Sequence, residues 1–162
     1  MNPAPVKQEI AKTAKTCKSF LIDPQHRFIS PHDYDGDWRS IAPTIGCTTF
    51  DRVVLNEEND AVFVDDEGLF SGTPHFFAFI GIGQPFAGRG LVLGADEKGY
   101  SATPKAQLEL LTAHLVFLEL LTAKPLVWKL WRATQPNTPH IVSNDKLMQL
   151  LLPADPSEGD HQ

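Results

Sequence analysis

The sequence predicts a single α+β domain with a mostly antiparallel sheet and one long amphipathic helix packed on a face. The chain has 162 residues, the length of one domain, and its hydrophobic content of 42% is ordinary for a globular protein. Residues 50–99 hold most of the strand-like pattern and most of the glycines. Residues 103–123 carry a leucine stripe at helical spacing.

The N-terminal part predicts an arm, a hairpin and a short helix. The arm, residues 1–17, is dotted with lysine, short of large apolar groups and opens with two prolines. Residues 18–23 and 27–30 are extended stretches joined by a turn-forming segment, which predicts a hairpin. A helix of about two turns is expected next, because Asp37 suits its N-cap and Gly46 suits its end.

The central stretch predicts three or four strands, with candidates at residues 50–56, 61–64, 75–82 and 91–93. Polar turns or glycine-rich segments separate these runs. The run at 75–82 is too apolar to have a wet face, so we expect a central strand there.

The long helix is predicted at residues 103–123. Thr103 suits its N-cap, and Pro104 suits the first helical position because its missing N–H would be unpaired anyway. An apolar stripe recurs at helical spacing, formed by Leu108, Leu111, Leu115 and Leu118. A face this broad is expected to pack on the sheet or on a partner, and homo-oligomerisation stays open beside a well-filled core.

The C-terminal part is expected to hold two shorter elements. Residues 126–133 contain Trp128 and Trp131 and fit either a short helix or a strand. Residues 134–162 predict a linker, a short amphipathic helix at 144–152 and an acidic tail. The core domain is therefore expected to span residues 18–133.

Charge and cysteine usage narrow the class of protein. The net charge of −6 argues against unspecific binding to nucleic acid or an anionic membrane and favours basic protein partners. The sequence shows neither a signal peptide nor a stretch apolar enough to cross a membrane. Cys17 and Cys47 stand in no metal-binding spacing and are expected to be reduced thiols. A cytoplasmic protein is predicted.

An acidic surface is the first candidate site. Between residues 51 and 67 the chain carries seven acidic residues against one base, Arg52. Two adjacent hairpin tips would present them to a basic groove on a protein partner, through Glu57, Glu58, Asp60, Asp65, Asp66 and Glu67. We expect Trp128 and Trp131 to add to this partner-binding surface. Solvated turns explain the same acidic residues without a partner.

A glycine-rich loop at residues 81–90 is the second candidate. Gly88, Arg89 and Gly90 could bring backbone amides and a guanidinium fork to a small anion or a phosphate-bearing nucleotide. The loop lacks the lysine and serine of a Walker motif and the spacing of the dinucleotide fingerprint. A glycine-rich connection between strands explains it without a ligand.

Catalysis, cofactors and metals are not predicted. The chain contains no GxSxG motif for an activated serine. Asp33, Asp35 and Asp37 open like a calcium loop, but the glycine and glutamate of an EF-hand are missing from their positions. Consecutive acidic residues at a turn, as at residues 65–67, rarely converge on one metal ion.

Four stretches carry a resemblance to a known group: LIDPQHRF, DYDGDWRSIAPTIGC, FVDDEGLFSG and GRGLVLGADEKG. They resemble a group of small phage- and plasmid-borne domains of unknown function, over about residues 20–103. The resemblance implies a bacterial cytoplasm and an accessory gene of a mobile element, and such genes often encode inhibitors of host defence.

We therefore predict a non-enzymatic accessory protein that binds and inhibits a host protein, such as a nucleic-acid-binding defence complex, through its acidic surface. The alternative is a small-ligand module that holds a phosphate-bearing nucleotide at residues 81–90.

Overall fold

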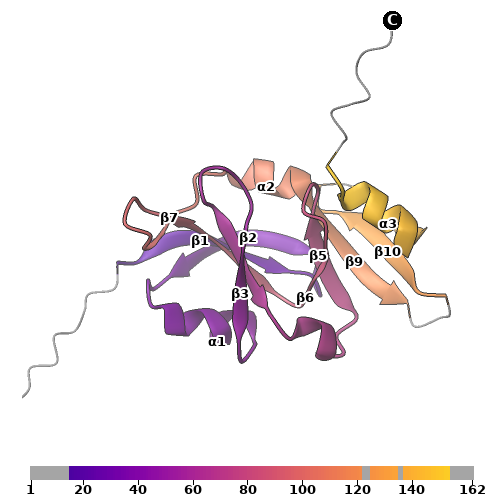
Figure 1. The fold of residues 1–162 in the computed structure, drawn as a ribbon, viewed down its shortest axis with the longest axis horizontal. Helices are drawn as coiled ribbons and strands as arrows, with labels where there is room; N and C mark the ends of the chain where they lie inside the picture. Colours follow the sequence, from indigo (N-terminus) through magenta and orange to yellow (C-terminus); the bar gives the residue numbers. More distant parts are fainter. Residues whose placement is uncertain (1–14, 122–124, 135–136, 154–162) are drawn as a thin grey trace, which may run out of the picture.

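Two antiparallel β-sheets make up most of the protein (Figure 1). The computed structural model describes residues 15–121, 125–134 and 137–153, and eleven strands lie within them. The predicted α+β class is therefore wrong, because the chain is mainly β and its helices are short. Most of the predicted arm and of the predicted acidic tail lies outside the described residues.

The first sheet has the strand order β2-β1-β7-β4-β3, with β8 paired to the end of β7. Its strands are β1 (Cys17–Asp23), β2 (Phe28–Tyr34), β3 (Phe50–Val54), β4 (Ala61–Asp65), β7 (Gly90–Ala95) and β8 (Ser101–Ala102). The central strand β7 is buried along nearly its whole length, as expected for a strand covered on both faces.

The second sheet has the order β11-β10-β9-β5-β6. Its strands are β5 (His75–Phe79), β6 (Phe86–Ala87), β9 (Leu115–Leu121), β10 (Val127–Arg132) and β11 (His140–Ser143). The two sheets pack face to face through one apolar core. The first sheet contributes Ile22, Val62 and Val92, and the second contributes Phe77, Phe117 and Trp131.

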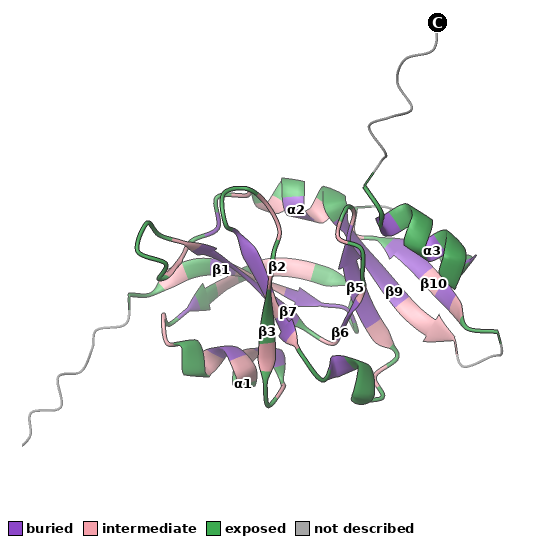
Figure 2. Ribbon diagram, in the orientation of Figure 1, coloured by how far each residue is buried: buried purple, intermediate pink, exposed green. Residues whose placement is uncertain are grey.

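Helices α1 (Ile41–Ile45) and α3 (Asn144–Leu151) cover the outer faces of the sandwich, and α2 (Leu108–His114) packs at the core between the sheets (Figures 1 and 2). Helix α1 packs on the first sheet, where its two terminal isoleucines meet Leu91 and Leu93. Helix α3 buries Leu147 and Leu151 against the second sheet. Helix α2 adds Leu111 to the core between the sheets. None of the helices in the described part of the chain is long and apolar enough to cross a membrane.

The predicted long helix at residues 103–123 is wrong. Among the described residues of this range, 103–121, the chain is helical only in α2, and β9 follows it directly. No side chain caps the start of α2, so the predicted cap at Thr103 is also wrong. A leucine-rich run without polar interruption fits a helix or a strand buried on both faces equally well, and pairing partners decide between them.

The pairing partners of β9 are β5 and β10, one on each side. In this central position its side chains alternate between two cores. Leu115 and Phe117 pack between the sheets, whereas Val116 and Leu118 face α3. The leucines read as one helical stripe therefore lie on opposite faces of a strand.

Several local predictions are confirmed. The β1–β2 hairpin forms, and Asp37 accepts the N–H of Arg39 at the start of a 3-10 turn, Trp38–Ser40, that leads into α1. Gly46 ends α1 in the left-handed conformation (φ 78°). The short C-terminal helix predicted at residues 144–152 is present as α3, and Ser143 caps it by accepting the N–H of Lys146.

The buried carboxylate of Asp60 positions the chain ahead of α2. It is fully buried at the end of the β3–β4 turn. Its two oxygens accept the backbone N–H groups of Lys105 (3.0 Å) and Ala106 (2.7 Å), and one also accepts the side-chain amide of Asn56 (2.9 Å). This carboxylate therefore satisfies backbone donors more than forty residues away.

Replacing Asp60 by alanine is expected to lower the free energy of unfolding by about 2–4 kcal/mol, because it strips these donors of their partner in the interior. Urea unfolding followed by tryptophan fluorescence measures the loss. Glu57→Ala, on the exposed side of the same turn, serves as the control and should change stability by no more than about 0.5 kcal/mol. Equal stability of both variants would contradict the role given to Asp60.

Candidate functional site

At one end of the sandwich, the inner face of the second sheet continues past the apolar core. Phe77 and Phe117 lie opposite each other within the core, and two residues further along the strands His75 lies opposite Glu119. Lys129 lies opposite Glu119 on the other side. Because side chains alternate with a period of two, His75, Glu119 and Lys129 form a polar row on the face that is apolar one row earlier.

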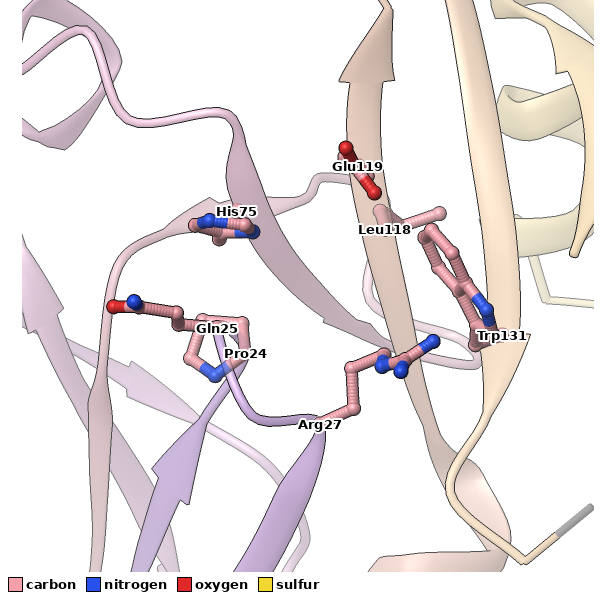
Figure 3. A pocket seen from close by; sticks show the side chains of 7 residues that line it. All are labelled: Pro24, Gln25, Arg27, His75, Leu118, Glu119 and Trp131. Atoms are coloured by element: carbon pink, nitrogen blue, oxygen red, sulfur yellow. The ribbon is translucent and has the colours of Figure 1, made fainter. Parts of the chain in front are cut away.

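The β1–β2 turn borders this row and encloses a pocket of about 170 Å³ (Figure 3). The turn contributes Pro24, Gln25 and Arg27, and the second sheet contributes His75, Leu118, Glu119 and Trp131. The exposed lining of this pocket is mainly polar. In small-molecule sites a few polar groups fix the orientation of the ligand and its specificity.

Arg27 reaches into this pocket from an unusual backbone position. It is one of two non-glycine residues with positive φ in the described part of the chain (φ 57°). Its guanidinium carbon lies 4.9 Å from the ring centroid of Trp131, a cation–π contact that orients the group. Arg27 takes part in none of the ion pairs between described residues.

The other arginine at this end, Arg89, holds the β1–β2 turn in place. Its Nη2 lies 3.2 Å from Oδ2 of Asp23, whose side chain is only 5% exposed. The same carboxylate accepts the backbone N–H of His26 at 3.1 Å and lies 3.1 Å from the imidazole Nδ1. Burial alone would raise the pKa of Asp23, but the hydrogen bonds from His26 and the charge of Arg89 outweigh it, so this pKa lies below its usual value.

In the glycine loop predicted to bind an anion, Gly88 and Arg89 make contacts within the protein. Arg89 pairs with Asp23, and the N–H of Gly88 donates to the backbone oxygen of His75 at 3.1 Å. A Cβ at Gly90 would lie 2.5 Å from the ring of Phe77, so close packing of the two sheets explains this glycine. In this structure Gly88 and Arg89 anchor the wall of the neighbouring pocket, and binding of an anion by this loop stays a prediction.

The predicted acidic tips lie at opposite ends of β4. Strand pairing places the β3–β4 turn beside Ala61 and puts Asp65 at the far end, opposite Phe50. Glu57 and Glu58 are exposed in that turn, whereas Asp60 is buried and is not available to a partner. The six acidic residues therefore do not form the single patch that the sequence predicted.

One of these ends combines acidic and apolar side chains. Asp66 and Glu67 are exposed, and the 3-10 turn Gly68–Phe70 follows them with Leu69 72% and Phe70 90% exposed. The backbone is nonetheless anchored: Asp65 accepts the N–H of Glu67, and Asp66 accepts the hydroxyl of Thr49. We refer to residues 65–70 as the acidic–aromatic segment.

The two tryptophans predicted to join a partner-binding surface belong to the interior, each 8% exposed. Trp128 packs edge-to-face on Phe76 at a centroid distance of 5.0 Å, and its indole N–H donates to Asn144. Trp131 lies in the core between the sheets. Their alternation along β10 places the two rings in different cores.

The pocket brings together residues that sequence reasoning missed. His75 and Glu119 are neighbours through the pairing of β5 and β9, and Arg27 joins them because the first sheet packs on the second. The sequence signal for His75 was its position two residues from Phe77, a spacing that puts both side chains on the same face of a strand. For Glu119 that signal was hidden, because its segment was interpreted as a helix.

Comparisons of this chain with family models, curated proteins and solved structures found no match. The resemblance to phage- and plasmid-borne domains therefore stays a prediction. In the described residues no group of three or more His, Cys, Asp or Glu side chains is placed to hold a metal ion.

Asp23→Asn tests the network that fixes the pocket wall. Because the folded pKa of Asp23 is depressed, its charge stabilises the protein above the unfolded pKa of about 4, and this contribution is lost as the pH falls through the lower folded value. We expect wild type to be more stable than Asp23→Asn at neutral pH and the gap to narrow below about pH 4. Urea unfolding across this range measures the gap.

A background variant, Arg89→Gln, makes the test specific. Removing one of the cations that depress the pKa should shrink the effect of Asp23→Asn, since two groups in contact couple energetically. The network would be ruled out if the stability difference between wild type and Asp23→Asn widened on acidification. It would also be ruled out if this difference were the same in the Arg89→Gln background.

Proposed function

We propose that this protein is a non-enzymatic binding module that docks a basic protein partner through the acidic–aromatic segment. The observation that carries the proposal is the exposure of Leu69 and Phe70, 72% and 90%, beside the exposed carboxylates of Asp66 and Glu67. Large apolar side chains held this far into water on an anchored backbone are a typical feature of interaction surfaces.

The segment suits a partner with an apolar pocket ringed by basic residues. Aromatic anchors that enter a pocket supply most of the binding energy of many interfaces. Charges at the rim act mainly on the rate of association and on the choice of partner. The anchored turn adds to affinity, because little backbone freedom remains to be lost on binding.

The anchoring contacts of the segment are local. The N–H of Phe70 donates to the backbone oxygen of Glu67 at 2.9 Å, and the N–H of Ser71 donates to that of Gly68 at 3.1 Å. Gly68 is buried, and a Cβ there would lie 3.0 Å from Cβ of Ala87 in β6. Gly68 thus sits close against the sheet while the two following side chains point outward.

The proposed partner is a basic, nucleic-acid-binding host protein in a bacterial cytoplasm, which the module would inhibit by occupying its basic surface. The net charge of −6 supports this choice and argues against direct binding of nucleic acid. Cys17 and Cys47 are both unpaired, which is compatible with a reducing compartment. The resemblance to domains of mobile elements supports an inhibitory role in a host.

The test uses substitutions that leave the turn intact. Asp65 and Asp66 hold the segment together, so Glu67→Lys and Phe70→Ala are the informative changes, and Glu57→Lys at the opposite end of β4 is the matched control. Protein captured from host extract on the immobilised full-length chain is identified, purified and titrated against all variants by calorimetry.

We expect Phe70→Ala to weaken binding about 30-fold, the size of a typical hot-spot loss. Glu67→Lys should weaken it less and reduce its sensitivity to salt, whereas Glu57→Lys should bind as wild type. A captured protein that binds all variants equally would refute the proposed docking surface.

A further inference from the structure

We propose that the pocket between the β1–β2 turn and the second sheet binds a small carboxylate that also carries a hydrogen-bond donor, namely a hydroxyl or an amino group. The site is formed by Arg27, His75, Glu119 and Trp131, with Lys129 next to it in the polar row. It is separate from the acidic–aromatic segment, and it does not depend on the proposed function.

The polar side chains around the pocket have no partners within the described chain. Arg27, His75 and Glu119 make no side-chain hydrogen bond or ion pair to another described residue, although His75 and Glu119 lie directly opposite each other on β5 and β9. Three polar groups that have no partner among the described residues thus line one cavity. A ligand with both an acceptor and a donor could pair with them at once.

Arg27 is the group that selects an anion. Its positive φ favours glycine or asparagine, so an arginine there is held at some energetic cost, and the ring of Trp131 fixes its guanidinium. A guanidinium that is already oriented can donate two parallel hydrogen bonds to a carboxylate with little loss of freedom. Arg27 and Lys129 also make this corner locally basic in a chain of net charge −6.

Glu119 decides between anions. Its carboxylate would repel a doubly charged phosphate and offers only acceptors, so a bound molecule must bring a donor to it. The pocket of about 170 Å³ is partly open to solvent and has room for a benzene-sized molecule, so it suits a ligand of a few heavy atoms. Small hydroxy acids and amino acids satisfy both conditions.

The experiment is a titration of the ¹⁵N-labelled full chain with glycolate, glycine, acetate and inorganic phosphate. Glycolate or glycine should shift the amide signals of His75 and Glu119 and the indole signal of Trp131, and should bind more tightly than acetate. Absence of shifts at these positions with both would overturn the proposal. Phosphate binding more tightly than either would overturn the assignment to carboxylates.

Arg27→Asn removes the guanidinium with a residue that tolerates positive φ, and a thermal melt verifies that the variant is folded. We expect it to raise the dissociation constant about ten-fold or more, the effect of losing a charge-assisted hydrogen bond. Arg39→Asn is the matched control, because Arg39 also lies over a tryptophan, at 5.9 Å from the ring of Trp38, but does not line the pocket. Equal binding by these two variants would contradict the proposal.

Glu119→Gln provides a second, independent readout. It keeps the shape of the side chain and removes its charge, so it should reduce the preference for glycolate or glycine over acetate. If the preference for glycolate or glycine over acetate were unchanged, Glu119 would not accept a hydrogen bond from the donor group of the ligand.

Discussion

The burial of β9 on both faces is the constraint on which the rest of the structure depends. Leu115 and Phe117 pack toward the first sheet, whereas Val116 and Leu118 face α3. Pairing with β5 and β10 satisfies the backbone of β9 within the second sheet. A strand in this position must be apolar throughout its centre. Because both of its faces need an apolar neighbour, the layers follow in the order helix, sheet, sheet and helix.

The same strand accounts for the pocket. Where the first sheet ends, the inner face of β9 changes from Phe117 to Glu119, and the apolar row gives way to a polar one. The β1–β2 turn closes over this point, held by the contacts of Asp23 with His26 and Arg89. Close approach of the sheets at Gly90 and Phe77 keeps the turn near the second sheet. The pocket thus forms because the second sheet extends past the end of the first.

Local chemistry could be predicted from the sequence, and long-range pairing could not. The cap at Asp37, the left-handed end at Gly46 and the hairpin of β1 and β2 depend on neighbouring residues and are confirmed. The segment after His114 has no such local signal, because leucine is common in helices and in strands covered on both faces. Because this segment was predicted as a helix, the position of Glu119 in the pocket could not be predicted either.

Burial of polar and aromatic residues was the other limit. Asp60 stands in a run of acidic residues that reads as a solvated turn, yet its carboxylate is enclosed by donors from residues 105 and 106. Trp128 and Trp131 were predicted to lie on a binding surface because the pairing of β10, which buries them, is not evident from the sequence. In each case the deciding partner lies elsewhere along the chain.

Backbone nuclear Overhauser contacts along residues 115–121 test the central claim most directly. The structure predicts contacts across the strands, from Phe117 to Phe77 on one side and to Trp131 on the other. It also predicts strong contacts between each α-proton and the next amide, which are characteristic of extended chain. Strong contacts between successive amides, and between residues three apart, would show a helix through this segment and contradict both the fold and the pocket built on it.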